Sequence, residues 1–167
     1  MWVCQHRHVA GQGLAERVHG LLRERSASVA TAESLTGGRL AAALTAVPGA
    51  SRTYVGGVVT YATSMKLDVL RVPPGLVAKH GVVSSECALA MARGVAGLTG
   101  ATYALSTTGV AGPDPQEGHP PGTVHVGMVG PELATALALE LVGNRLVICE
   151  RTCDEALSAL ADILGSA

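Results

Sequence analysis

One serine, Ser34, stands where chemistry is expected, in the segment ESLTGG at residues 33–38. A short β-prone stretch precedes this segment and an Ala- and Leu-rich stretch follows it. Free N–H groups at a helix start can hold a phosphate or a developing oxyanion, and a serine at a strand-to-helix turn is placed to attack a carbonyl carbon. In a second interpretation, Ser34 or Thr36 simply caps the helix and the two glycines form the turn. The segment predicts a hydrolase of a small phosphorylated metabolite only if a base is found nearby.

Lys66 is the strongest candidate for that base, because serine is a poor nucleophile without one. If a short helix begins at Ser64, Lys66 lies in its first turn, where the helix dipole disfavours a cation. A base that works near neutral pH needs a pKa about three units below the ordinary lysine value. The dipole alone is too weak, so burial or a second cation must contribute. Tyr61, at the end of the preceding strand, could relay a proton or hold the lysine; alternatively, Lys66 is a solvated surface residue.

Histidines offer a competing arrangement. His80, His119 and His125 are possible bases, with Asp114 as the orienting carboxylate of a Ser–His–Asp site. None of them stands in a recognisable triad context, and His19 is interpreted as a helix-surface residue.

A weak possibility of metal binding comes from alternating residues at the N-terminus. They are Cys4, His6 and His8. A flexible terminus gives no fixed ligand geometry, so the sequence predicts no metal site.

Two further segments are suited to an anionic ligand. A predicted strand opens into a glycine-rich loop, TTGVAGP at 107–113, at the end where open α/β sheets bind ligands. It lacks the patterns of dinucleotide-binding and P-loop folds. Near the C-terminus, Asn144 could cap the last helix and leave Arg145 in its first turn. Arg145 is then either bound to an anion such as a phosphate or solvated.

Hydrophobic periodicity predicts the elements that position these residues. Helices are expected over 12–26, from the glycine pair to 47, over 64–70, from Ser84 onward and over 145–164; strands are expected over 28–33, 53–61, 102–107, 123–129 and 134–142. The helix from Ser84 is predicted to carry Met91, Val95 and Leu98 on one face, and the last helix to turn Leu157, Leu160 and Leu164 inward. This order predicts an α/β fold, a mixed β-sheet flanked by helices in a single domain with a late β-hairpin and a C-terminal helix.

Composition supports one domain. The chain has 167 residues, 48% of them hydrophobic, but no Phe, so Ala, Val and Leu must fill the core and helices must pack closely on the sheet. Residues 1–11 are expected to be a flexible N-terminal extension, and 12–167 the domain. A net charge of −1 gives no electrostatic case for a nucleic-acid partner. No apolar run approaches a membrane span and no secretory signal is evident, which predicts a soluble cytoplasmic protein without a membrane partner.

Together, five segments resemble the C-terminal domain of the competence/damage-inducible protein CinA, a family that includes stand-alone nicotinamide-nucleotide amidohydrolases. They are AESLTGG (32–38), VPGASRTYVGGVVTYATSMKLDVL (47–70), KHGVVSSE (79–86), TTGVAGP (107–113) and PPGTV (120–124). They occur in the family's order and spacing and cover most of the chain from about residue 12 onward.

The resemblance implies hydrolysis of the carboxamide of nicotinamide mononucleotide, giving nicotinate mononucleotide and ammonia. Ser34 matches the nucleophile, Lys66 its basic partner and Tyr61 a supporting tyrosine, and N–H groups near the Gly37–Gly38 turn would stabilise the oxyanion. The implied substrate-binding residues are Thr36, Gly37, Gly38, Thr108, Gly109, Ala111, Gly112 and Arg145. The resemblance implies no metal or organic cofactor. It does imply a homo-oligomer. The alternatives are a non-catalytic nucleotide-binding or regulatory module and an amidohydrolase of another phosphorylated amide.

Four positions depart from the family pattern. Leu35 replaces a usual Cys, Thr63 a common Asn, Asn144 an Asp, and Cys149 a basic residue. None of these removes a predicted catalytic residue.

Overall fold

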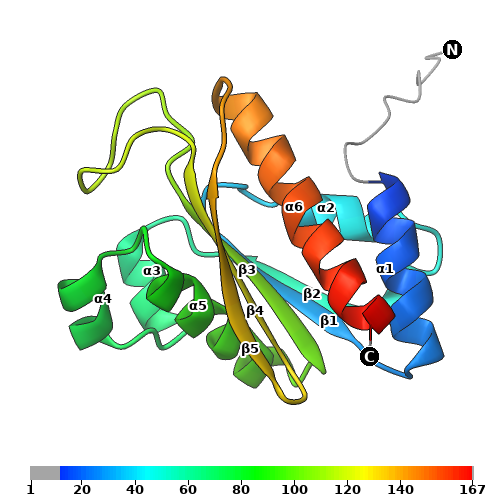
Figure 1. The fold of residues 1–167 in the computed structure, drawn as a ribbon. Helices are drawn as coiled ribbons and strands as arrows, with labels where there is room; N and C mark the ends of the chain where they lie inside the picture. Colours follow the sequence, from blue (N-terminus) through cyan, green and yellow to red (C-terminus); the bar gives the residue numbers. More distant parts are fainter. Residues whose placement is uncertain (1–11, 167) are drawn as a thin grey trace, which may run out of the picture.

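The computed structural model describes residues 12–166, so the predicted extension at 1–11 and its Cys4, His6 and His8 lie outside the described residues. Its centre is a five-stranded sheet with the order β2-β1-β3-β4-β5 (Figure 1). The strands are β1 (Val29–Glu33), β2 (Tyr54–Val59), β3 (Tyr103–Gly109), β4 (Thr123–Gly130) and β5 (Leu133–Glu140). β1 pairs in parallel with β2 and β3, whereas β4 runs antiparallel to β3 and β5. The predicted mixed sheet with a late hairpin is confirmed.

Helices cover both faces of this sheet (Figure 1). One face carries α1 (Gln12–Glu24), α2 (Arg39–Thr45) and α6 (Arg145–Ser166). The other carries α3 (Thr63–Asp68), α4 (Pro74–His80) and α5 (Ser85–Thr99). Each face has its own hydrophobic core, so the sheet is buried on both sides at its centre.

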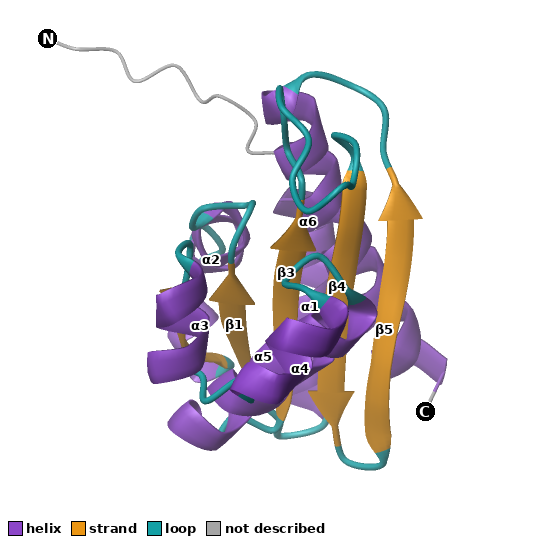
Figure 2. Cartoon of the chain, turned by 90° about the vertical axis from the view of Figure 1, so that its left-hand side faces the viewer, coloured by secondary structure: helices purple, strands orange, loops and turns teal. Residues whose placement is uncertain are grey.

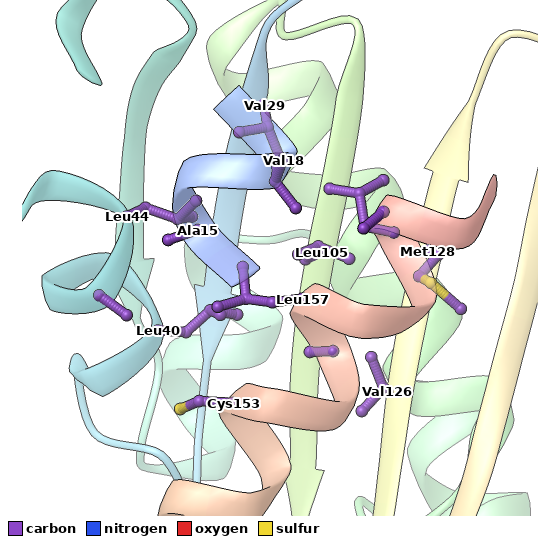
Figure 3. Packing of buried hydrophobic residues seen from close by; sticks show 14 of the residues in the cluster. Ala15, Val18, Val29, Leu40, Leu44, Leu105, Val126, Met128, Cys153 and Leu157 are labelled. Carbon is purple, nitrogen blue, oxygen red and sulfur yellow. The ribbon is translucent and has the colours of Figure 1, made fainter. Parts of the chain in front are cut away.

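Small side chains let the layers approach closely, as the absence of Phe predicts. Val18, Leu40 and Leu157 meet Leu105 of β3 in the core under α1, α2 and α6 (Figure 3). On the other face, α5 lies so near β4 that a Cβ added to Gly127 would stand 2.4 Å from the carbonyl oxygen of Ala88. The close helix–sheet packing is therefore confirmed.

Some element predictions need correction. The strand predicted over 53–61 ends at Val59, and helix α4 was not predicted. A Pro-Pro-Gly run is typical of a turn, but Pro74 occupies the first position of α4, where its missing N–H costs nothing. Met91 and Val95 are fully buried, whereas 56% of the surface of Leu98, predicted on the same face of the helix, is exposed.

His19 is not the surface residue that the helical pattern predicted. Its side chain is fully buried. The ring Nε2 donates to the Leu44 carbonyl oxygen over 2.9 Å, and Nδ1 faces the Thr53 hydroxyl. His19 therefore joins α1 to α2 and to Thr53, the residue directly after the 3₁₀ turn Ala50–Arg52.

Among residues 12–166, no helix combines the length and the apolar character that crossing a bilayer requires.

Candidate active site

The sheet topology brings three strand ends to one edge. β1 lies between β2 and β3, and all three run in parallel, so their carboxyl ends meet at one edge; Figure 2 shows β1 and β3 ending there. Ser34 follows β1, the segment 60–66 follows β2, and the glycine-rich loop follows β3. Ser34 is therefore flanked by the lysine segment on one side and the loop on the other, the usual place for a ligand site in such sheets.

Lys66 and Ser34 are in direct contact. Lys66 Nζ lies 3.0 Å from Ser34 Oγ, 2.8 Å from the Thr60 carbonyl oxygen and 3.3 Å from that of Tyr61. Only 1% of the lysine surface is exposed, so the solvated alternative is wrong. In the described part of the chain, no carboxylate forms an ion pair with it.

This environment favours the neutral amine. Burial lowers the pKa of Lys66, and the nearby Cys87 and Glu117 only partly oppose that shift. A neutral amine has two N–H donors and one lone pair. The two carbonyl oxygens, of Thr60 and Tyr61, occupy the donors, which leaves the lone pair to accept the proton of the Ser34 hydroxyl. The geometry is that of a general base and its nucleophile.

The prediction that Lys66 lies in the first turn of a helix, where the dipole would lower its pKa, is wrong. Helix α3 spans Thr63–Asp68 and Lys66 lies in its last turn, not its first. Burial, rather than the helix dipole, is therefore the main cause of the lowered pKa.

Glu33 occupies the N-terminus of α2. Its buried carboxylate accepts hydrogen bonds from the N–H groups of Gly38, Leu40 and Ala41 and from the Thr36 hydroxyl, over 2.6–3.1 Å. The charge thus satisfies the free donors of the helix end from within the protein.

The predicted oxyanion site at the Gly37–Gly38 turn is therefore wrong. The Gly38 N–H is held by Glu33, and the Gly37 N–H donates to the Ser34 carbonyl oxygen. Within residues 12–166, no acceptor is found for the N–H of Leu35, which lines the pocket beside Ser34. That N–H, directly after Ser34, is available to an anionic oxygen atom in the pocket.

A pocket opens next to Ser34 and Lys66. Its wall comes from the turn at 34–35, the segment 61–66, the connection at 82–83, the loop at 108–116 and Arg145. It brings together most of the predicted site residues, namely Ser34, Tyr61, Lys66, Thr108, Gly109, Ala111, Gly112 and Arg145. The predicted Thr36, Gly37 and Gly38 do not line it; Thr36 is buried between Glu33 and Thr107.

Tyr61 and Arg145 meet at the rim of this pocket. Arg145 donates to the Tyr61 hydroxyl over 2.6 Å and to the Gly112 carbonyl oxygen over 2.8 Å. The Tyr61 phenol therefore faces the arginine, and its carbonyl, not its ring, holds Lys66. Both partners of the Arg145 guanidinium, the Tyr61 hydroxyl and the Gly112 carbonyl, are neutral, so its charge is available to an anion.

Asn144 caps α6 as predicted, since its side chain accepts from the Val147 N–H over 3.0 Å.

The Ser–His–Asp arrangement is not formed. His80 pairs with Glu86 at 3.3 Å, and His125 lies 3.0 Å from the Ser85 hydroxyl. Among the described residues, no histidine contacts Ser34, whose partner is Lys66.

Sequence reasoning missed several residues of the site. Asp114 was weighed only as a partner for histidine and Gln116 not at all, because the loop at 114–119 lies between two matched motifs. Val82 and Val83 carry no chemical signal. Glu33 did carry a signal in the sequence, because it is a charged residue at the end of an apolar strand. Such a charge is buried only when hydrogen-bond partners surround it.

Comparisons with known proteins agree with this architecture. A family model described as the CinA C-terminal domain matches residues 11–164. A CinA-like protein from Frankia casuarinae is 53% identical over 136 residues, which are 81% of this chain and 31% of that relative. The chain thus spans about a third of the length of the curated relatives it matches.

Solved structures show the same fold. A competence-damaged protein (CinA) superfamily protein from Klebsiella pneumoniae matches with a TM-score of 0.90 and 34% identity, over 93% of this chain and 98% of that one. The competence damage-inducible protein A (ComA) from Klebsiella pneumoniae subsp. pneumoniae matches equally well, with a TM-score of 0.90 and 34% identity over 92% and 96% of the two chains.

Proposed function

The chain belongs to the CinA C-terminal domain family, and from that premise we propose that it hydrolyses the carboxamide of nicotinamide mononucleotide to nicotinate mononucleotide and ammonia. The observation that carries the proposal is the contact of 3.0 Å between Ser34 Oγ and the buried amine of Lys66. A neutral lysine beside a serine hydroxyl is an established variant of the serine–histidine logic.

The reaction proceeds through an acyl-enzyme. Neutral Lys66 accepts the hydroxyl proton while Ser34 Oγ bonds to the amide carbon, and the Leu35 N–H donates to the resulting oxyanion. Protonated Lys66 then gives its proton to the amide nitrogen, the carbon–nitrogen bond breaks and ammonia leaves. A water molecule attacks the ester, Lys66 again acts as base, and the carboxylic acid and free Ser34 result.

Arg145 supports a phosphorylated substrate. Its guanidinium lies on the pocket wall with only the Tyr61 hydroxyl and the Gly112 carbonyl as partners. A phosphate can replace these neutral acceptors with stronger, charge-assisted hydrogen bonds. Tyr61 then positions Arg145 through its hydroxyl, and Lys66 supplies the proton to the leaving nitrogen.

The first experiment measures ammonia release from nicotinamide mononucleotide by the purified chain. We expect Ser34→Ala and Lys66→Ala each to lower kcat by about 10³-fold or more, because each removes one half of a concerted pair. Matched controls are Ser51→Ala and Lys79→Ala, which change exposed residues away from the pocket and should retain full activity.

Two results would contradict the proposal. A folded wild type that binds the nucleotide without releasing ammonia would be a non-catalytic binding module. Release of ammonia from another phosphorylated amide, but not from this one, would keep the serine–lysine mechanism and change the substrate.

A further inference from the structure

One carboxylate joins the β3–β4 loop to the opposite wall of the pocket. Glu117 Oε2 accepts hydrogen bonds from the N–H groups of Val82 and Val83, over 2.8 Å and 3.2 Å. Val82 and Val83 line the pocket on the connection between α4 and α5. The contact therefore links two chain segments that face each other across the pocket.

The loop carries polar residues of the pocket on either side of this contact. Residues 113–118 are all exposed to solvent, and two of them, Asp114 and Gln116, line the pocket. Gln116 and His119 pair through their backbones, which closes the tip of the loop on itself without tying it to the rest of the domain. The attachment of the tip to the neighbouring wall comes from Glu117.

The receiving segment is shaped for a carboxylate. Gly81 has a φ of +74°, and a Cβ added there would stand 2.5 Å from Glu117 Oε2. Any other residue would therefore push the carboxylate away from the Val82 and Val83 N–H groups. The Val82 carbonyl accepts from the Thr108 hydroxyl over 2.7 Å, which fixes the peptide plane that also carries the Val83 N–H.

From this geometry we infer that Glu117 is a positioning residue: it latches the loop at 113–119 onto Gly81–Val83 and so holds Asp114 and Gln116 on the wall of the substrate pocket. The inference rests on the proposed function for the identity of the substrate. The latch itself is a backbone contact that can be measured without turnover.

Kinetics should separate positioning from chemistry. In Glu117→Ala we expect KM for nicotinamide mononucleotide to rise about 10-fold. We expect kcat, measured at a pH where it no longer varies with pH, to change by less than about 3-fold. The structure shows no hydrogen bond from residues 113–119 to Ser34 or Lys66, whose partners are each other and backbone groups outside this loop. Glu117→Gln keeps an acceptor oxygen and should restore most of the affinity.

The chain offers a matched control. Glu132 is an exposed glutamate with a φ of +56°, close to the +50° of Glu117, but it lies in the β4–β5 turn at the far end of the hairpin. Glu132→Ala should leave KM unchanged. Gly81→Ala should also raise KM, because it displaces the carboxylate and strains a backbone whose φ of +74° suits glycine.

Hydrogen exchange supplies the readout that is independent of activity. The Val82 and Val83 amides should exchange at least about 10-fold faster in Glu117→Ala than in wild type or Glu132→Ala. Unchanged exchange would overturn the latch, and faster exchange with an unchanged KM would overturn its positioning role. A wild type that releases no ammonia would instead contradict the proposed function, while the exchange comparison would still decide the latch.

Discussion

At the scale of single residues, the site depends on how the amine of Lys66 is surrounded. Two backbone carbonyls and one hydroxyl face it, and burial lowers its pKa. A solvated lysine would be protonated at neutral pH and could not accept a proton, so the proposed role of Lys66 as a base requires this burial. The same burial makes the amine costly to charge.

The pH dependence of kcat follows from this. Below its pKa, Lys66 is protonated and cannot accept the Ser34 proton, so kcat should fall at low pH and rise as the amine loses its proton. Because burial lowers the pKa, the rise should be centred below the ordinary lysine value of 10.5. The pH profile of kcat checks this, since it reports groups in the enzyme–substrate complex.

Lys66→Arg provides the comparison. A guanidinium stays protonated throughout the accessible range, so this variant should be inactive at every pH. A kcat for wild type that does not vary with pH, or a rise that persists in Lys66→Arg, would exclude Lys66 as the base.

The sequence predicted the Ser34–Lys66 pair because residue type, strand ends and the resemblance all pointed to it. It did not predict the partners of that pair. The Thr60 and Tyr61 carbonyls and the Leu35 N–H are backbone groups, which every residue possesses, so only the folded chain reveals which of them face the site.

At the scale of elements, helix α2 depends on a residue of the preceding strand. The α2 N-cap is Gly38, which has no side chain to accept a hydrogen bond. Glu33, at the end of β1, accepts from three N–H groups of this helix end instead. The strand, the nucleophile turn and the helix are thus joined around one buried carboxylate.

Removing this carboxylate should destabilise the domain. In Glu33→Ala, buried N–H groups lose their acceptor, and we expect the free energy of unfolding to fall by about 3 kcal/mol or more. Glu33→Gln should also destabilise, by about 1–3 kcal/mol, because its NH₂ group would face other donors. Urea denaturation measures both, with the exposed Glu24→Ala as control. An unchanged midpoint for Glu33→Ala would show that the cap contributes nothing.

Element types were predicted better than element ends. Alternating and helical hydrophobic patterns found the strands and most helices because one face of each is buried. Helix α4 was not predicted, because none of its residues is buried and the Pro-Pro-Gly run at its start is typical of a turn. Periodicity predicted that Leu98 shares a face with Met91 and Val95, but a shared face does not fix burial: Leu98 is exposed and the other two are buried.

At the scale of the whole molecule, the site is held by the contact between layers. Lys66 reaches Ser34 from α3, and the chain leaving α3 passes beneath α5 at Leu70. A Cβ added to Gly94 of α5 would stand 2.2 Å from the Leu70 carbonyl oxygen. The absence of a side chain at Gly94 therefore sets how closely α5 can lie on the segment that follows Lys66.

Two glycines of the same helix test this. Gly94 and Gly97 both lie in α5, but nothing stands within 4 Å of a Cβ added to Gly97. Alanine raises helix propensity at both positions, so Gly97→Ala should stabilise the domain by about 0.5–1 kcal/mol. In Gly94→Ala the overpacking, about 1–3 kcal/mol, should outweigh that gain and lower the unfolding midpoint.

Activity should separate the same pair. Gly97→Ala changes no contact between layers and should release ammonia at the wild-type rate. Gly94→Ala must move Leu70 or α5, and because Leu70 follows the α3 turn that holds Lys66, kcat should fall even where the protein remains folded. Equal midpoints and equal kcat for the two variants would mean that the layers adjust without disturbing Lys66, and that the Ser34–Lys66 distance is set locally by the ends of β1 and β2.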